Sequence, residues 1–398
     1  MTGSEDYGIG FYERMMLLKY SPIGKLLWRF VNYSDRAFSS VGYAIAPALE
    51  ATYVAMSDAT LKVDARGQFV WTRRVPGTYV RAIIARDNRI FVAGGRYVDP
   101  YSSDVWVACY DSDGNALWSD GFNGGDFDIA HQIQFDRVGD IVVSARLNSI
   151  HDRHTLNLGV LKYTQAGLRK WARSISLSES SEIGTAAIDP ENNIVMGGIT
   201  GYDGYVNTTF ALKLDQEGNT VWVDFRNYFA DAEQVRLGNC DAIGNIYLAV
   251  SSEGGPIFAL KYSPDGDLIH DTVTDIRSWY RLGAAASDQD GNIYLPATRL
   301  PYEAGSIICK VTTSGTVAWS QTLRDGASHE EPRAALGADN SVYMSTGSNF
   351  GGNWDILSAK YVQTDGRMLA FSGVDRRLQS AVVPPSGYHS GGNEPASP

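Results

Sequence analysis

Residues 212–222 read Leu-Lys-Leu-Asp-Gln-Glu-Gly-Asn-Thr-Val-Trp, and this pattern decides the fold because it recurs along the whole chain. Each copy joins an apolar residue, usually followed by lysine, to a glycine and usually to a tryptophan four residues after that glycine. Glycine and its polar neighbours suit a tight turn, and the flanking aliphatic and aromatic residues suit strands, so each copy predicts a β-hairpin. The eight copies centre on Gly24/Trp28, Gly67/Trp71, Gly114/Trp118, Gly167/Trp171, Gly218/Trp222, Gly266/His270, Gly315/Trp319 and Gly366/Ala370.

A second motif alternates with the first and predicts another hairpin in every unit. Its clearest copies are Asp-Ala-Ile-Gly-Asn-Ile-Tyr at residues 241–247 and Asp-Gln-Asp-Gly-Asn-Ile-Tyr at residues 288–294. Five weaker copies begin near residues 52, 88, 136, 189 and 341. A unit of about 49 residues therefore holds four short antiparallel strands, a to d, which is typical of a β-propeller blade.

The sequence predicts an all-β protein with a single β-propeller of four-stranded antiparallel blades over residues 1–383, followed by a tail at residues 384–398. Eight hairpins of the first kind but seven of the second leave the first one without a partner. We favour eight blades, with residues 1–4 as the end of strand b and residues 378–383 as the inner strand of the blade that closes the ring. Seven complete blades with an appended N-terminal hairpin is the alternative.

Composition narrows the class of partner. The chain of 398 residues carries a formal net charge of −11, and no run of Lys or Arg exceeds two residues, so we expect no nucleic-acid partner. No apolar stretch approaches 18 residues, which predicts no membrane insertion, and residues 1–6 do not resemble a signal peptide. The compartment and the oligomeric state stay open.

The tryptophan column and the lysine column are predicted to be structural. A large aromatic residue at one fixed point of each blade is expected to wedge between neighbouring sheets rather than to stack on a ligand. Four units also pair the lysine with an aspartate that opens the other turn, and we expect at least two of these pairs to be ion pairs. The four pairs are Asp136 with Lys162, Asp189 with Lys213, Asp241 with Lys261 and Asp288 with Lys310.

These two motifs resemble the repeats of the SBBP-type bacterial β-propeller family over nearly the whole chain. The Gly-x-x-x-Trp part is also similar to the tryptophan-docking motif of quinoprotein-type propellers. Such quinoproteins carry adjacent cysteines beside the cofactor, whereas Cys109, Cys240 and Cys309 lie in different repeats, so we expect no quinone and no other cofactor. The resemblance implies a fold and no particular function.

The long loops between strands b and c and between strands d and a are expected to share one face, opposite the short turns. This face is the predicted binding face, because loops carry function and these loops are where the units diverge most. Aromatic and arginine side chains there suit a protein or glycan partner. The predicted binding residues are Tyr202, Tyr205, Phe225, Arg226, Trp279, Tyr280, Arg281 and Trp354.

The sequence gives little support for a metal site or for a catalytic site. His151, Asp152 and His154 are poorly spaced for a metal site, and the Asp-rich segments 111–115 and 288–292 are explained by turn chemistry rather than by calcium, so we predict no metal. Polar residues are expected around the channel mouth, but they form no catalytic set. They are Glu182, Glu330, Glu331, His329, His131 and Arg281.

The favoured interpretation is therefore a non-enzymatic binding or assembly module that presents the variable-loop face to a protein or glycan. A surface, secreted, virion or appendage component fits this repeat type. The alternative is an enzyme that acts on a polysaccharide or polyphenol at the channel mouth.

Overall fold

The computed structural model describes most of the repeat array and consists of β-strands. The described residues are 2–5, 14–21, 25–31, 42–148, 156–178, 180–201, 208–228, 232–252, 255–274, 276, 280–299, 305–324, 328–337, 339, 341–350 and 353–372. They contain no helix, and therefore none of the length and apolar character needed to cross a membrane.

From β4 on, the described strands form seven sheets of four strand positions, each paired antiparallel in sequence order, and a single parallel pair, Leu156 with Ser180, links the third sheet to the fourth. The first four sheets comprise β4 (Gly42–Pro47), β5 (Ala51–Met56), β6 (Ala59–Asp64) and β7 (Phe69–Arg74); β8 (Thr78–Arg86), β9 (Arg89–Asp99), β10 (Ser102–Asp111) and β11 (Ala116–Phe122); β12 (Ile129–Phe135), β13 (Ile141–Asn148), β14 (Leu156–Tyr163) and β15 (Arg169–Ile175); and β16 (Ser180–Ile188), β17 (Ile194–Gly201), β18 (Thr208–Leu214) and β19 (Thr220–Arg226).

The next three sheets repeat this order. They comprise β20 (Ala232–Cys240), β21 (Ile246–Ser252), β22 (Phe258–Tyr262) and β23 (Leu268–Val273); β24 (Tyr280–Leu282) with β25 (Ala286–Ser287), β26 (Ile293–Arg299), β27 (Ser306–Val311) and β28 (Val317–Leu323); and β29 (Ser328–Leu336), β30 (Ser341–Phe350), β31 (Asn353–Val362) and β32 (Met368–Ser372). In the sixth sheet the innermost strand is divided, and both pieces pair with β26.

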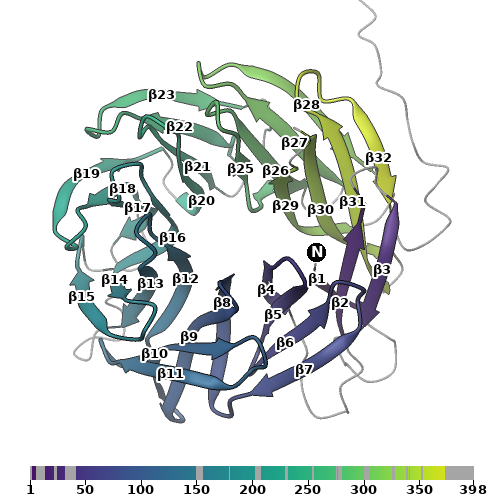
Figure 1. Cartoon of the computed structure of the whole chain (residues 1–398). Coiled ribbons are helices and arrows are strands. Elements are labelled where there is room, and N and C mark those ends of the chain that lie inside the picture. Colours follow the sequence, from purple (N-terminus) through teal and green to yellow (C-terminus); the bar gives the residue numbers. More distant parts are fainter. Residues whose placement is uncertain are drawn as a thin grey trace, which may run out of the picture.

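The sheets stand around a central axis as the blades of a propeller (Figure 1), with the first strand of each sheet innermost and the last outermost. The fold class predicted from the two hairpin motifs, an all-β propeller of four-stranded antiparallel blades, is confirmed. Each predicted turn glycine from Gly67 to Gly366 has a positive φ, the conformation that these hairpins require.

A three-stranded sheet lies between the first and last of these sheets (Figure 1). It contains β1 (Thr2–Glu5), β2 (Arg14–Tyr20) and β3 (Leu26–Val31). Leu17 of β2 packs in a cluster with Val54 of β5, and Leu18 packs with Ile356 of β31, so β2 contacts both neighbours. The position of β1 beside β2 agrees with the predicted second strand of a further blade. Residues 378–383 lie outside the described residues, so the count of eight blades stays a prediction.

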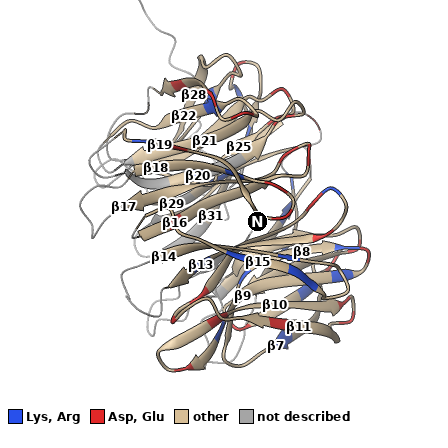
Figure 2. Cartoon of the chain, turned by 90° about the vertical axis from the view of Figure 1, so that its left-hand side faces the viewer, with Lys and Arg blue, Asp and Glu red and all other residues tan. Residues whose placement is uncertain are grey.

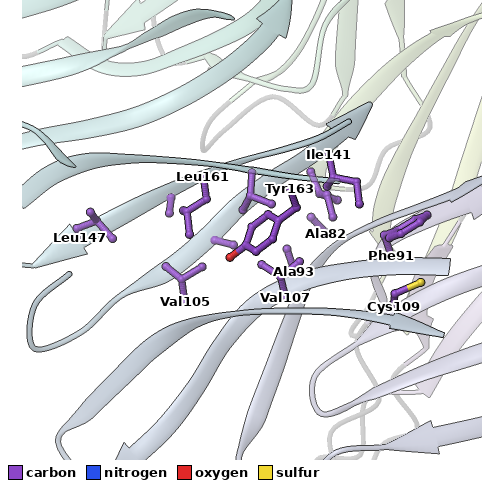
Figure 3. Packing of buried hydrophobic residues seen from close by; sticks show 14 residues of the cluster. Ala82, Phe91, Ala93, Val105, Val107, Cys109, Ile141, Leu147, Leu161 and Tyr163 are labelled. Carbon is purple, nitrogen blue, oxygen red and sulfur yellow. The ribbon is translucent and has the colours of Figure 1, made fainter. Parts of the chain in front are cut away.

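The core lies between neighbouring sheets. Val105, Val107 and Cys109 of β10 pack against Leu161 and Tyr163 of β14 in one cluster (Figure 3). The two middle strands of a blade are covered on both faces, and this explains why they read as continuous apolar runs rather than as alternating ones. Each fully buried large side chain contributes about 1.5–3 kcal/mol, so the interfaces between sheets carry most of the stability.

Candidate binding face

The short turns form one face of the ring and are held by hydrogen bonds within the protein. Asp111 is typical: its Oδ1 accepts from the backbone amides of Asp113 at 2.9 Å and Asn115 at 2.8 Å, as expected for turn chemistry rather than a calcium loop. Asp288 caps its turn in the same way. The two kinds of turn also bond to each other, since Gln165 Nε2 donates to the carbonyl of Gly139 at 2.9 Å. The short turns therefore share a face, as predicted.

The six tryptophans of the repeat column each join one unit to the next on this side of the ring. Trp71 Nε1 donates to the carbonyl oxygen of Ser112 at 3.1 Å, and Lys62 Nζ donates to the same oxygen at 2.7 Å. The same paired donation reaches the carbonyls of Gln216, Pro264 and Gln363. The tryptophans are structural, as predicted, although only Trp71 and Trp319 are buried. The other four are half-buried because strand d is the outermost strand.

Two of the four predicted ion pairs are present, which confirms the prediction of at least two. Lys162 Nζ lies 2.9 Å from Asp136 Oδ2, and Lys213 Nζ lies 2.9 Å from Asp189 Oδ2. Both pairs are buried. In the other two units a tyrosine hydroxyl donates a hydrogen bond to the aspartate carboxylate instead. The lysine Nζ then lies 5.5 Å from the centroid of the tyrosine ring. These tyrosines are Tyr247, bonded to Asp241, and Tyr294, bonded to Asp288.

The opposite face carries the long loops, and the structure places only part of the predicted binding set. Tyr202, Tyr205 and Trp279 lie outside the described residues. Tyr280 and Arg281 belong to β24 and Trp354 to β31, but only their backbone is described. The members that the structure describes are thus spread over three different sheets, through β19, β24 and β31.

Phe225 and Arg226 are the two members whose side chains are described, and both lie at the end of the outermost strand β19. The Phe225 ring is 44% exposed and follows Val221 and Val223 on the same outward side of the strand. Arg226 Nε donates to Asp224 Oδ2 at 2.6 Å. The Arg226 guanidinium is therefore already engaged within its own strand, so it is a weaker candidate anchor than Phe225.

The β9–β10 hairpin is the best-described part of this face, and the predicted residue set did not include it. It ends in exposed apolar and aromatic side chains: Tyr97 is 48%, Val98 64% and Tyr101 81% exposed. Asp99 fixes the tip, because its carboxylate accepts from the Tyr101 amide at 2.7 Å and from Ser102 Oγ at 2.6 Å. From the sequence, residues 97–103 are recognised as a long loop between two strands. Whether this loop projects from the face depends on how far β9 and β10 stay paired, and they pair as far as Asp99 and Ser102.

Aromatic packing holds this hairpin against the innermost strand of its own blade, β8, and against the segment that leads to the next blade. The Tyr97 ring lies 5.1 Å from Tyr79 and 6.2 Å from Phe127 between centroids. Tyr79 Oη is 2.9 Å from Ser103 Oγ, which donates to the backbone carbonyl of Asp128 at 3.0 Å. The exposed rings are thus presented on a rigid support, and such preorganisation reduces the entropy lost on binding.

Of the polar residues predicted at the channel mouth, His131, Glu182 and His329 lie on the innermost strands β12, β16 and β29. Burial, reinforced by Arg146, Arg81 and Arg236, lowers the pKa of His131 to about 4, so its imidazole is neutral at pH 7. His329 is buried and its Nδ1 lies 2.9 Å from Ser306 Oγ, which is a structural contact. The side chains of Glu330, Glu331 and Arg281 are not among those described.

No group of three or more His, Cys, Asp or Glu that could hold a metal occurs among the described residues. The segment containing His151, Asp152 and His154 lies outside them. Charged side chains of the described part appear mainly at turns along one side of the ring (Figure 2).

Comparison with known proteins supports the fold. No family model matches the sequence, and no curated protein matches it. Among solved structures, the WD40 domain of SCAP from fission yeast aligns with a TM-score of 0.50 at 8% identity, covering 83% of this chain and 85% of that one. Puromycin hydrolase, as an S511A mutant complexed with PGG, aligns with a TM-score of 0.50 at 11% identity, covering 87% of this chain and 58% of that one. The chain is a β-propeller protein, and identities this low show the fold alone.

Proposed function

We propose that this propeller is a non-enzymatic binding module of the SBBP-like repeat type, which presents its long-loop face to a protein partner. The β9–β10 hairpin carries the proposal, because Tyr97, Val98 and Tyr101 are exposed on a support that is packed and hydrogen-bonded from below. Tyrosine on a rigid loop is a typical anchor of protein interfaces, and an exposed aliphatic side chain between two tyrosines suits a protein better than a glycan.

The contrast between the two faces supports this assignment. On the opposite face, polar groups of the turns form hydrogen bonds with one another, as Gln165 does with the carbonyl of Gly139. Tyr101 contributes its backbone amide to the tip, and its ring stays in solvent.

Panning a random-peptide display library on the immobilised protein tests the proposal. We expect peptides selected on the wild type to lose at least tenfold in affinity on Val98→Ser/Tyr101→Ser, because interface anchors of this kind contribute 1–2 kcal/mol or more each. The thermal unfolding midpoint should stay within about 2 °C, because both side chains are mostly in solvent.

The matched control is Val138→Ser/Ile243→Ser, which removes two equally exposed apolar residues, 75% and 76%, from the short-turn face. It should bind the selected peptides as the wild type does. Trp279→Ala/Tyr280→Ala/Arg281→Ala tests the rest of the predicted set in the same assay. Two results would place the binding surface elsewhere. One is unchanged peptide affinity in both the hairpin variant and the triple variant. The other is loss of peptide binding in the short-turn control.

A further inference from the structure

Three buried polar atoms in the blade β12–β15 have no hydrogen-bond partner among the residues that the structure describes. They are Nε2 of His131 on β12 and, on β13, Oγ of Ser144 and Nε of Arg146. His131 is the extra residue of a β-bulge beside the pair of Gln132 with Ser144. Ser144 and Arg146 are two residues apart, so their side chains leave β13 on the same side. A buried polar atom without a partner destabilises the folded protein, and three of them in one blade need an explanation.

Arginines of the neighbouring innermost strands add positive charge to this place. Arg81 is the bulged residue of β8, as His131 is of β12, and these two strands pack against each other. Bulges re-aim side chains and are common beside functional sites. Burial and then the charges of Arg146, Arg81 and Arg236 of β20 lower the pKa of the imidazole. Arginines of three sheets thus act on one histidine of the innermost strands, which face the axis of the ring (Figure 1).

The carboxylates that the structure describes do not neutralise Arg81 or Arg146, since neither arginine forms an ion pair with them. The Arg81 guanidinium lies instead over the ring of Tyr43, 4.7 Å from its centroid. Arginines on the outermost strands do find carboxylates, namely those of Asp58, Asp120 and Asp224. In a chain with a formal net charge of −11, positive groups gathered without such partners are typical of a binding site.

An oxyanion would satisfy all of these groups. The fork of a guanidinium matches two oxygens of a carboxylate or a phosphate, and stacking on Tyr43 orients the fork of Arg81 while its N–H groups stay at the edge. The Ser144 hydroxyl and an Nε2–H tautomer of His131 are further donors. A neutral ligand would leave the arginine charges unbalanced. Because the arginines come from different sheets, a ligand with several anionic oxygens fits them better than one with a single charge.

We propose that the innermost strands hold a binding site for a small polyvalent oxyanion, formed by Arg81, Arg146, His131 and Ser144. Carboxylate and phosphate groups share the required chemistry, so the ligand class is an organic polyacid or a phosphate compound with at least two negative charges. Arg236 adds to the attraction of the anion. This inference does not depend on the proposed binding of a protein by the long-loop face.

Isothermal titration calorimetry of the full chain at constant ionic strength tests the site with two probes, citrate as a tricarboxylate and inorganic phosphate. We expect saturable binding of at least one of them, and the tighter one identifies the class of ligand. Arg81→Gln/Arg146→Gln should weaken this binding at least tenfold, because charge-assisted contacts are lost. The matched control, Arg66→Gln/Arg367→Gln, removes the same charge from two exposed turn positions and should bind as the wild type does. Binding of neither probe, or an equal loss in the control, would overturn the proposal.

Unfolding without ligand separates a binding site from a structural charge cluster. Because the arginines repel one another, we expect Arg81→Gln/Arg146→Gln to keep or raise the thermal unfolding midpoint without ligand. The same variant should lose the rise in midpoint that the bound probe gives the wild type. A midpoint lowered by more than about 5 °C without ligand would show that the arginines support the blades, and would overturn the proposal. If the double variant does not fold, Arg81→Gln alone changes an exposed side chain, and unchanged affinity in that variant would overturn the site.

Discussion

Trp222 Nε1 donates a hydrogen bond of 3.1 Å to the carbonyl oxygen of Pro264, which lies in the next blade 42 residues further along the chain. The indole also covers Gly266 and stacks on Tyr262 at 6.1 Å between ring centroids. One side chain thus combines a hydrogen bond, ring stacking and the burial of a turn. Because the same contact recurs around the ring, the blades are joined edge to edge by the residue that marks the repeat in the sequence.

Replacing Trp222 should separate these contributions. We expect Trp222→Ala to lower the free energy of unfolding by about 3 kcal/mol, since it removes a large packed ring. Trp222→Phe keeps an aromatic ring and loses the hydrogen bond, which is worth about 1 kcal/mol, and Lys213 still donates to the Pro264 oxygen. Equilibrium urea unfolding followed by circular dichroism measures both. Equal losses in the two variants would show that packing contributes little.

The turn glycine beneath the indole should be sensitive to both conformation and space. Gly266 has φ +94°, and a Cβ there would lie 2.7 Å from Trp222. Gly77 has φ +77° with nothing within 4 Å, so Gly77→Ala measures the conformational cost alone, about 1–2 kcal/mol. We expect Gly266→Ala to cost at least about 1 kcal/mol more, because the ring must shift. Thermal unfolding of the two variants makes the comparison, and equal costs would contradict it.

The buried ion pair between Lys162 and Asp136 should be sensitive to loss of one partner. Their side chains are 6% and 1% exposed, so Lys162→Met leaves a buried carboxylate without its cation and should cost about 3 kcal/mol. Lys261→Met is the matched control, because Lys261 bonds to Thr313 and makes no ion pair with Asp241. That variant should cost about 1 kcal/mol or less. Similar losses from chemical denaturation would show that the buried pair adds nothing.

The same carboxylates should make stability depend on pH. Burial alone would raise the pKa of Asp136, but hydrogen bonds from Lys162, Asn192 and the backbone amide of Asp140 outweigh it and lower the pKa below its ordinary value. The pKa of Asp189 is lowered in the same way: burial raises it, and Lys213 and Asn193 outweigh burial.

A lowered pKa in the folded state stabilises the protein above the unfolded pKa of about 3.9, and this contribution is lost as the pH falls through the folded value. We therefore expect Asp136→Asn/Asp189→Asn to lose more stability at pH 6 than at pH 3. Urea unfolding at the two pH values measures the difference, and an equal loss at both would contradict the prediction.

The cysteine thiols should be unreactive while the protein is folded. Burial raises the pKa of Cys109 to about 11 and that of Cys240 to about 12, and Cys309 is fully buried. Because the thiolate is the reactive form, labelling with Ellman's reagent at pH 8 should be at least tenfold slower in the native protein than in 6 M guanidinium. Rapid labelling of one thiol in the native state would show that its blade interface opens.

The amino-acid sequence by itself determined the blades. Each hairpin is specified locally, since Asp241 caps its turn through the backbone amides of Ile243 and Asn245, and Gly244 supplies the positive φ. Apolar runs on both sides of such turns then form the middle strands. Because these interactions span about six residues and recur in every unit, the pattern is readable without knowledge of distant contacts.

Only the tertiary structure decided which residues of different blades and strands meet. The sequence aligns Lys261 with Asp241 as well as it aligns Lys162 with Asp136, yet only the second pair forms. The residue opposite the lysine on the neighbouring strand gives the reason. Opposite Lys162 it is Val142, which has no polar group to compete for the Asp136 carboxylate. Opposite Lys261 it is Tyr247, whose hydroxyl donates a hydrogen bond to Asp241. Likewise the exposed tip of β9–β10 depends on the contacts of Tyr97 with Tyr79 of β8 and with Phe127, which lies between β11 and β12. Such contacts depend on side-chain volume and on the packing of neighbouring sheets, which residue spacing does not encode.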